Sequence, residues 1–102
     1  MERRLKLQGL LENDILGSRN VYFQPPENLQ MHYPAIRYNI ADIRHLHANN
    51  KPYTRKPAYE LTLIDENPDS EFVEKLDSLP MCSFDRHYKA DNLNHWVYLL
   101  YW

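Results

Sequence analysis

The C-terminal stretch of the chain decides the fold most clearly. It reads Cys82-Ser-Phe-Asp-Arg-His-Tyr-Lys-Ala-Asp-Asn-Leu-Asn-His-Trp-Val-Tyr-Leu-Leu-Tyr-Trp102. Alternation of apolar and other residues predicts strands at Ser83–Tyr88 and His95–Trp102, and the polar residues 89–94 between them predict the turn. Two interpretations of the aromatic last strand stay open. Either it lies within the domain's own sheet, or a neighbouring copy or partner covers part of it.

Three more strands are predicted upstream from the same two-residue alternation. They are Asn20–Gln24, Tyr33–Ile40 and Tyr59–Ile64. In the second of these, Ile36, Tyr38 and Ile40 share one face and Arg37 lies on the other, which is typical of a half-buried antiparallel strand. The third strand sets Tyr59, Leu61 and Leu63 against Glu60, Thr62 and Ile64, and we expect it to be covered on both faces.

Two helices complete the pattern. Glu2–Leu16 is amphipathic and Gly17 is placed to end it. The second helix is predicted to start at Asn67-Pro68, with Asn67 as its N-cap, and to end at Pro80. The expected fold class is therefore α+β: a two-layer sandwich in which an antiparallel sheet of about four to five strands is flanked by two helices, in the order α-β-β-β-α-β-β.

Composition limits the classes of protein to consider. A chain of 102 residues is expected to form one domain, residues 1–102. The net charge of −2 gives no general attraction to nucleic acid or to an anionic membrane. Cys82 is the only cysteine, so no intrachain disulfide forms, and we find neither a signal segment nor an apolar run that could span a bilayer. These features favour a reducing cytoplasm and no membrane association.

The segment Ala41–Pro57 is the one locally basic part of the chain. A connection of this length inside a compact domain is usually functional or mobile. It contains a single carboxylate, Asp42, and Tyr53 is interleaved with the cations. The basic and histidine residues are Arg44, His45, His47, Lys51, Arg55 and Lys56. We expect this loop to meet a partner, and a nucleic-acid phosphate track stays open as an alternative to an acidic protein surface.

Motifs that carry chemistry are largely missing from the sequence. It has no glycine-rich phosphate loop, nucleophile elbow or paired-cysteine zinc pattern, so no catalytic residue, cofactor or metal is expected. Candidates remain as alternatives: a histidine metal site, a Cys82 and His87 pair, and a small hydrolase that uses Asp85 and His87. The metal candidates are His45 and His47 with His32, His87 or His95, and the other carboxylates weighed for acid–base work are Asp91 and Glu60.

Several stretches together resemble a family of small virion proteins of tailed bacteriophages. They are Val21-Tyr-Phe-Gln-Pro-Pro-Glu-Asn-Leu-Gln-Met-His-Tyr-Pro-Ala-Ile-Arg-Tyr38, Lys51-Pro-Tyr53, Tyr59-Glu-Leu-Thr-Leu-Ile-Asp65, Pro68-Asp-Ser70, Leu79-Pro-Met-Cys-Ser-Phe-Asp-Arg86 and Ala90-Asp-Asn-Leu-Asn-His95. Within that family, the order of elements is similar to the tail terminators of long-tailed phages. The chain departs from the family pattern at Trp96, where a polar or acidic residue is usual.

The resemblance implies a structural role without catalysis. Tail terminators form hexameric rings that cap the completed tail tube and join it to the head through the neck. The implied partners are other copies of the chain, the tail tube protein and a head-closure or neck protein, with DNA passing through the lumen. The implied location is the tail–neck junction of the virion, after assembly in the host cytoplasm. A head-closure or other neck connector is the alternative.

The expected interface residues combine the basic loop with the aromatic C-terminus. An aromatic and arginine-bearing surface is typical of protein interfaces, and a ring subunit needs two different contact surfaces. The expected interface residues are Arg44, His45, His47, Lys51, Tyr53, Arg55, Lys56, Tyr101 and Trp102.

Overall fold

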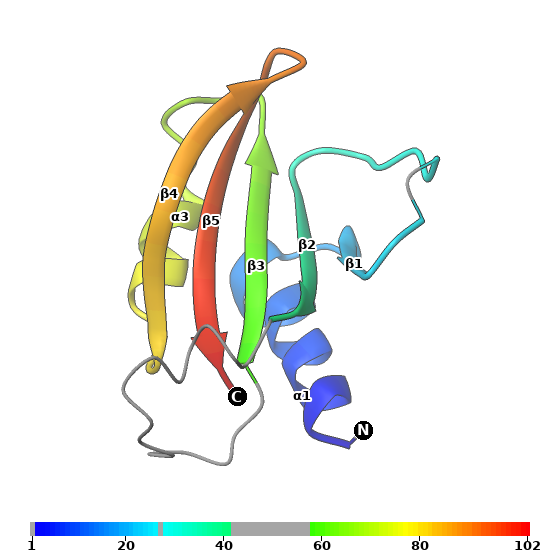
Figure 1. Ribbon diagram of the computed structural model, residues 1–102, viewed down its shortest axis with the longest axis vertical. Helices are drawn as coiled ribbons and strands as arrows, with labels where there is room; N and C mark the ends of the chain where they lie inside the picture. Colours follow the sequence, from blue (N-terminus) through cyan, green and yellow to red (C-terminus); the bar gives the residue numbers. More distant parts are fainter. Residues whose placement is uncertain (1, 27, 42–57) are drawn as a thin grey trace.

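The chain folds around one five-stranded sheet. The computed structural model describes residues 2–26, 28–41 and 58–102. The strands are ordered β1-β2-β3-β5-β4 across the sheet (Figure 1). Their bounds are β1 Val21–Phe23, β2 Ala35–Ile40, β3 Ala58–Asp65, β4 Cys82–Ala90 and β5 Leu93–Tyr101. The helical segments are α1 Glu2–Leu10, the π-helical η1 Leu11–Leu16 and α3 Phe72–Asp77.

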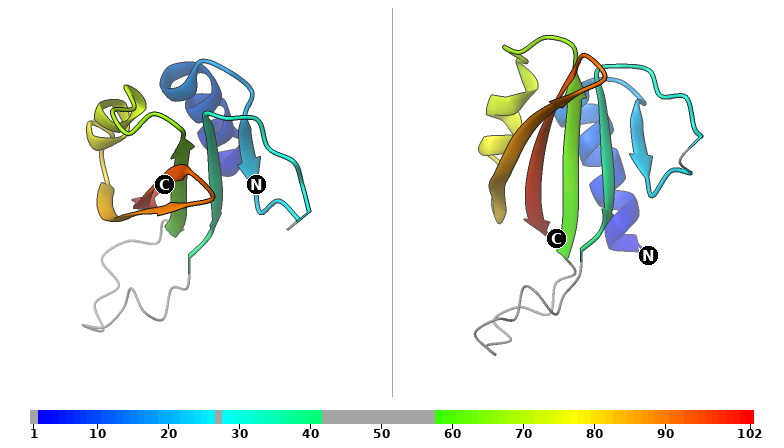
Figure 2. Two further views of the ribbon diagram at one scale, coloured as in Figure 1. Left: turned by 90° about the horizontal axis from the view of Figure 1, so that it is seen from above. Right: turned by 45° about the horizontal axis from the view of Figure 1, so that its top comes forward.

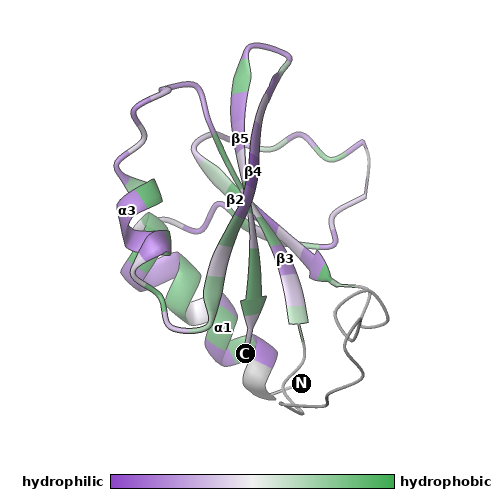
Figure 3. Ribbon diagram, turned by 60° about the vertical axis from the view of Figure 1, so that its left-hand side comes forward, coloured by the Kyte–Doolittle hydropathy of each residue, from purple (hydrophilic) through white to green (hydrophobic). Residues whose placement is uncertain are grey.

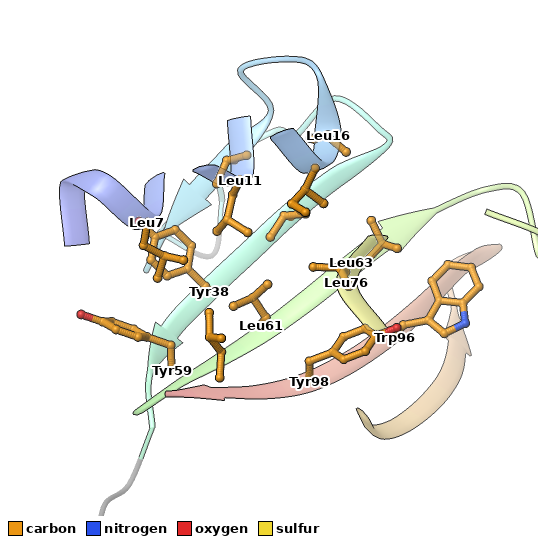
Figure 4. Packing of buried hydrophobic residues seen from close by; sticks show 14 residues of the cluster. Leu7, Leu11, Leu16, Tyr38, Tyr59, Leu61, Leu63, Leu76, Trp96 and Tyr98 are labelled. Atoms are coloured by element: carbon orange, nitrogen blue, oxygen red, sulfur yellow. The ribbon is translucent and has the colours of Figure 1, made fainter. Parts of the chain in front are cut away.

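The helical segments among the described residues lie on one side of the sheet (Figures 1 and 2), and the core fills the space between the two layers. Leu7 of α1 and Leu11 of η1 belong to the same buried cluster as Leu61 of β3 and Tyr98 of β5 (Figure 4). None of these four side chains is exposed. A helix that buries an apolar stripe against one face of a sheet gives a two-layer domain. The predicted α+β sandwich and its order α-β-β-β-α-β-β are confirmed.

The direction of β1 differs from the prediction. β1 pairs with β2 in parallel, with Val21 opposite Ile36, whereas the other three strand pairs are antiparallel. Residues 24–34 connect the two strands by a route that returns the chain to the same end of the sheet (Figure 1). Parallel neighbours require such a return, because a tight turn produces only antiparallel pairs. The sheet is therefore mixed.

The aromatic last strand lies inside the domain's own sheet. β5 pairs with β3 on one side and with β4 on the other, so it has no open edge. The first of the two interpretations is therefore correct for this strand, and β4 forms the edge. β3 is buried on both faces over most of its length, as predicted.

The helices also differ from the prediction in detail. The first helix changes to π-helical geometry at Leu11 before Gly17, at φ 71°, ends it. The second begins later than predicted, at Phe72 with Glu71 as its N-cap. Asn67 Oδ1 instead accepts a hydrogen bond from the Asp69 amide at 3.0 Å, which closes an isolated turn before the helix. A local side-chain bond of this kind competes with helix initiation.

The turn between β4 and β5 is tighter than predicted and strains its own residues. Asp91 and Asn92 have φ of 54° and 63°, the left-handed conformations of a two-residue hairpin turn. Because glycine adopts this conformation without a Cβ penalty, Asn92→Gly is expected to raise the free energy of unfolding by roughly 0.5–1 kcal/mol. Urea denaturation measures the change. Asn92→Val is the control, since a β-branched residue is disfavoured at positive φ, and a stabilised Val variant would contradict this explanation.

Candidate functional site

The face of the sheet opposite the helices carries the candidate site. In Figure 1 it is the face toward the viewer, and no helix within residues 2–26, 28–41 and 58–102 covers it. Strand register places Arg37, Thr62, Val97 and Arg86 in one row across β2, β3, β5 and β4. The adjacent row is Ala35, Ile64, His95 and Tyr88. Directly opposed residues point to the same side of a sheet, and we call these two rows the open face because no helix of the described residues lies over them. Ala35, Thr62, Ile64 and Val97 are nevertheless buried, so the exposed surface of this face is formed by Arg86 and Tyr88, with Arg37 and His95 partly exposed.

Arg37 is the unusual group on the open face. Its Nε atom is buried and has no hydrogen-bond partner. The one ion pair in the described part of the chain joins Arg86 to Asp85, so Arg37 has no counter-ion there. Glu60 lies on the same side of the sheet, opposite Asn39, without reaching the Arg37 guanidinium. Arg37 is partly exposed, so water can solvate its charge, whereas the buried Nε–H lacks an acceptor and carries a desolvation cost that a hydrogen-bond acceptor would relieve.

An aromatic stack lies beside the arginine row. The Tyr88 and His95 rings are parallel within 10°, with centroids 4.6 Å apart. Burial lowers the pKa of His95, and the charge of Arg37 and the electrostatic effect of the His87 ring lower it further, against opposing effects of the Leu93 carbonyl and the Asp91 carboxylate. The imidazole is therefore predominantly neutral at neutral pH, and its flat surface together with Tyr88 suits a stacked or apolar contact.

The lowered pKa of His95 makes stability depend on pH. The unfolded chain binds a proton at His95 more tightly than the folded chain does. The folded state is therefore destabilised relative to the unfolded state as the pH falls below 6.5, the pKa of an ordinary histidine, toward the lower pKa of His95 in the folded chain. We expect the urea midpoint of the wild type to fall between pH 7 and pH 5 by more than that of His95→Gln. His32→Gln, at an exposed histidine, is the matched control and should behave as the wild type. An equal or steeper fall in His95→Gln would contradict this assignment.

The open edge of the sheet is protected against strand addition. β4 is exposed along almost its whole length, and a bulge at Asp85 interrupts its pairing with β5. Figure 3 shows hydrophilic residues along the middle of this strand, where Asp85, Arg86 and His87 lie. Bulges and charged side chains are features by which native edge strands avoid pairing with another chain. The β4 edge is therefore poorly suited to strand addition by another chain.

The residues predicted as alternative chemical sites are placed apart. Asp85 pairs with Arg86, whereas His87 Nε2 lies 3.1 Å from Asn94 Oδ1 and its ring packs against Trp96. Cys82 lies opposite Leu100 and His87 opposite Trp96, which separates the proposed thiol and imidazole along the strands. Burial, and then the Asp77 carboxylate, raise the pKa of the Cys82 thiol to about 11, so the reactive thiolate is disfavoured.

The predicted interface residues fall into two groups. Tyr101 lies opposite Ala58 at the C-terminal end of β5 and is half-buried, and Trp102 packs against the hydrophobic core. The remaining seven lie outside the described residues: Arg44, His45, His47, Lys51, Tyr53, Arg55 and Lys56. Sequence reasoning did not select Arg37 as a site residue, although the alternation in residues 33–40 placed it on the face away from the core.

Two other kinds of site are absent from the described residues. No group of three or more His, Cys, Asp or Glu side chains there is arranged to hold a metal ion. None of the helices among those residues is long and apolar enough to cross a membrane.

The fold defines an α+β protein with a two-layer, mixed-sheet domain, in which the described helices lie on one face of the sheet. Comparison of the chain with protein-family models, with curated proteins and with solved structures finds no match.

Proposed function

We propose that the chain is a structural subunit of a tailed-phage virion that assembles into a ring, most specifically a tail terminator. The observation that carries the proposal is the open face, where a half-buried Arg37 lacks a counter-ion beside the Tyr88 and His95 stack. Arginine and aromatic residues are enriched in protein interfaces. The exposed Arg86 and Tyr88 on one side of the sheet and the helical layer on the other supply two different surfaces, which head-to-tail association requires.

Ring closure is the geometric consequence of such a contact. A heterologous interface produces either a closed ring or an open filament, depending on the rotation between neighbouring copies. The resemblance of the sequence to tail terminators favours closure at six copies. The ring would cap the tail tube and meet a head-closure or neck protein, with DNA passing through the lumen, and would reside at the tail–neck junction after assembly in the host cytoplasm. No cofactor takes part.

A head-closure or other neck connector is the second position in the virion that suits the same subunit. The hydrolase alternative is less well supported, because Asp85 and His87 each pair with a different residue. A nucleic-acid-binding module would have to use the same open face, with Arg37 contacting phosphate and the Tyr88 ring stacking on a base.

Electron microscopy of the purified protein tests the proposal. We expect uniform rings with a central opening, and these rings should attach to the ends of tail tubes. Attachment to the neck side of heads instead of to tubes would support the head-closure position. The absence of any ring, combined with oligonucleotide binding that weakens steeply with salt, would replace the proposal with the nucleic-acid alternative.

A further inference from the structure

We draw no further inference here: the strongest candidate, the exposed apolar side chains of Met81 and Phe84 at the start of the edge strand β4, carries no proposal because nothing in the structure shows what covers them.

Discussion

Replacing Leu61 by alanine is expected to lower the free energy of unfolding by about 3 kcal/mol. Leu61 lies in the middle of β3, its side chain has no exposed surface, and it packs in the core between the sheet and the helical layer. Truncation of a buried leucine removes its transfer free energy and leaves a cavity that the neighbours fill only partly. Because a small domain is stable by roughly 5–15 kcal/mol, this single change removes a large share.

Leu5→Ala is the matched control, because it makes the same chemical change at a side chain that is 55% exposed. Its effect should stay within about 0.5 kcal/mol. Urea denaturation at one fixed protein concentration measures both variants, since assembly adds to apparent stability. Equal losses in Leu5→Ala and Leu61→Ala would show that Leu61 is not in a tightly packed core.

The second large effect is expected at the C-terminus. Trp102→Ala should lower the free energy of unfolding by about 2 kcal/mol, because this side chain packs against the core cluster while remaining partly exposed. Trp102 was selected from the sequence as an interface residue. Its packing indicates that a loss of assembly in any Trp102 variant must first be separated from a loss of folding.

Trp102→Phe serves as the control, since it retains most of the apolar contact. Thermal unfolding of the isolated variants at a concentration below assembly gives the comparison. We expect Trp102→Phe to lie close to the wild type and Trp102→Ala to melt several degrees lower. A normal melting temperature in Trp102→Ala together with impaired assembly would return this residue to the interface.

The sequence allowed the elements to be predicted because apolar periodicity is strong in this chain. Alternation in residues 33–40 correctly placed Ile36 and Tyr38 in the core and Arg37 on the other face. Ile40 was expected on the core side and is 58% exposed, since it is the last residue of β2 before the chain leaves the sheet. Alternation defines faces and not the ends of strands.

The direction of β1 and the position of β5 could not be predicted in the same way. Period-two alternation is identical in parallel and antiparallel strands, and it does not say which strands are neighbours. The candidate site depends on the position of β5. Arg37 comes into one row with Arg86 only because β2, β3, β5 and β4 are adjacent in that order. Without the strand register, the sequence does not show which residues of different strands lie side by side.

The histidines illustrate the same difficulty at the level of chemistry. His87 and His95 were each considered as a possible further ligand for a His45 and His47 metal site, and they lie on opposite faces of the sheet: His87 is opposite Trp96, and His95 is stacked on Tyr88. The strand register and not the spacing in sequence decides this placement. The bulge at Asp85 also shifts the alternation along β4, so Phe84 lies opposite Tyr98 on the core face, whereas strict alternation predicts one face for Phe84, Arg86 and Tyr88.

The solution mass of the purified chain across a concentration series, measured by light scattering after gel filtration, tests the central claim most directly. We predict one discrete assembled species near six copies in equilibrium with the 12.3 kDa monomer. A mass that remains at the monomer value at every concentration, or that grows without limit, would contradict a closed ring of this subunit.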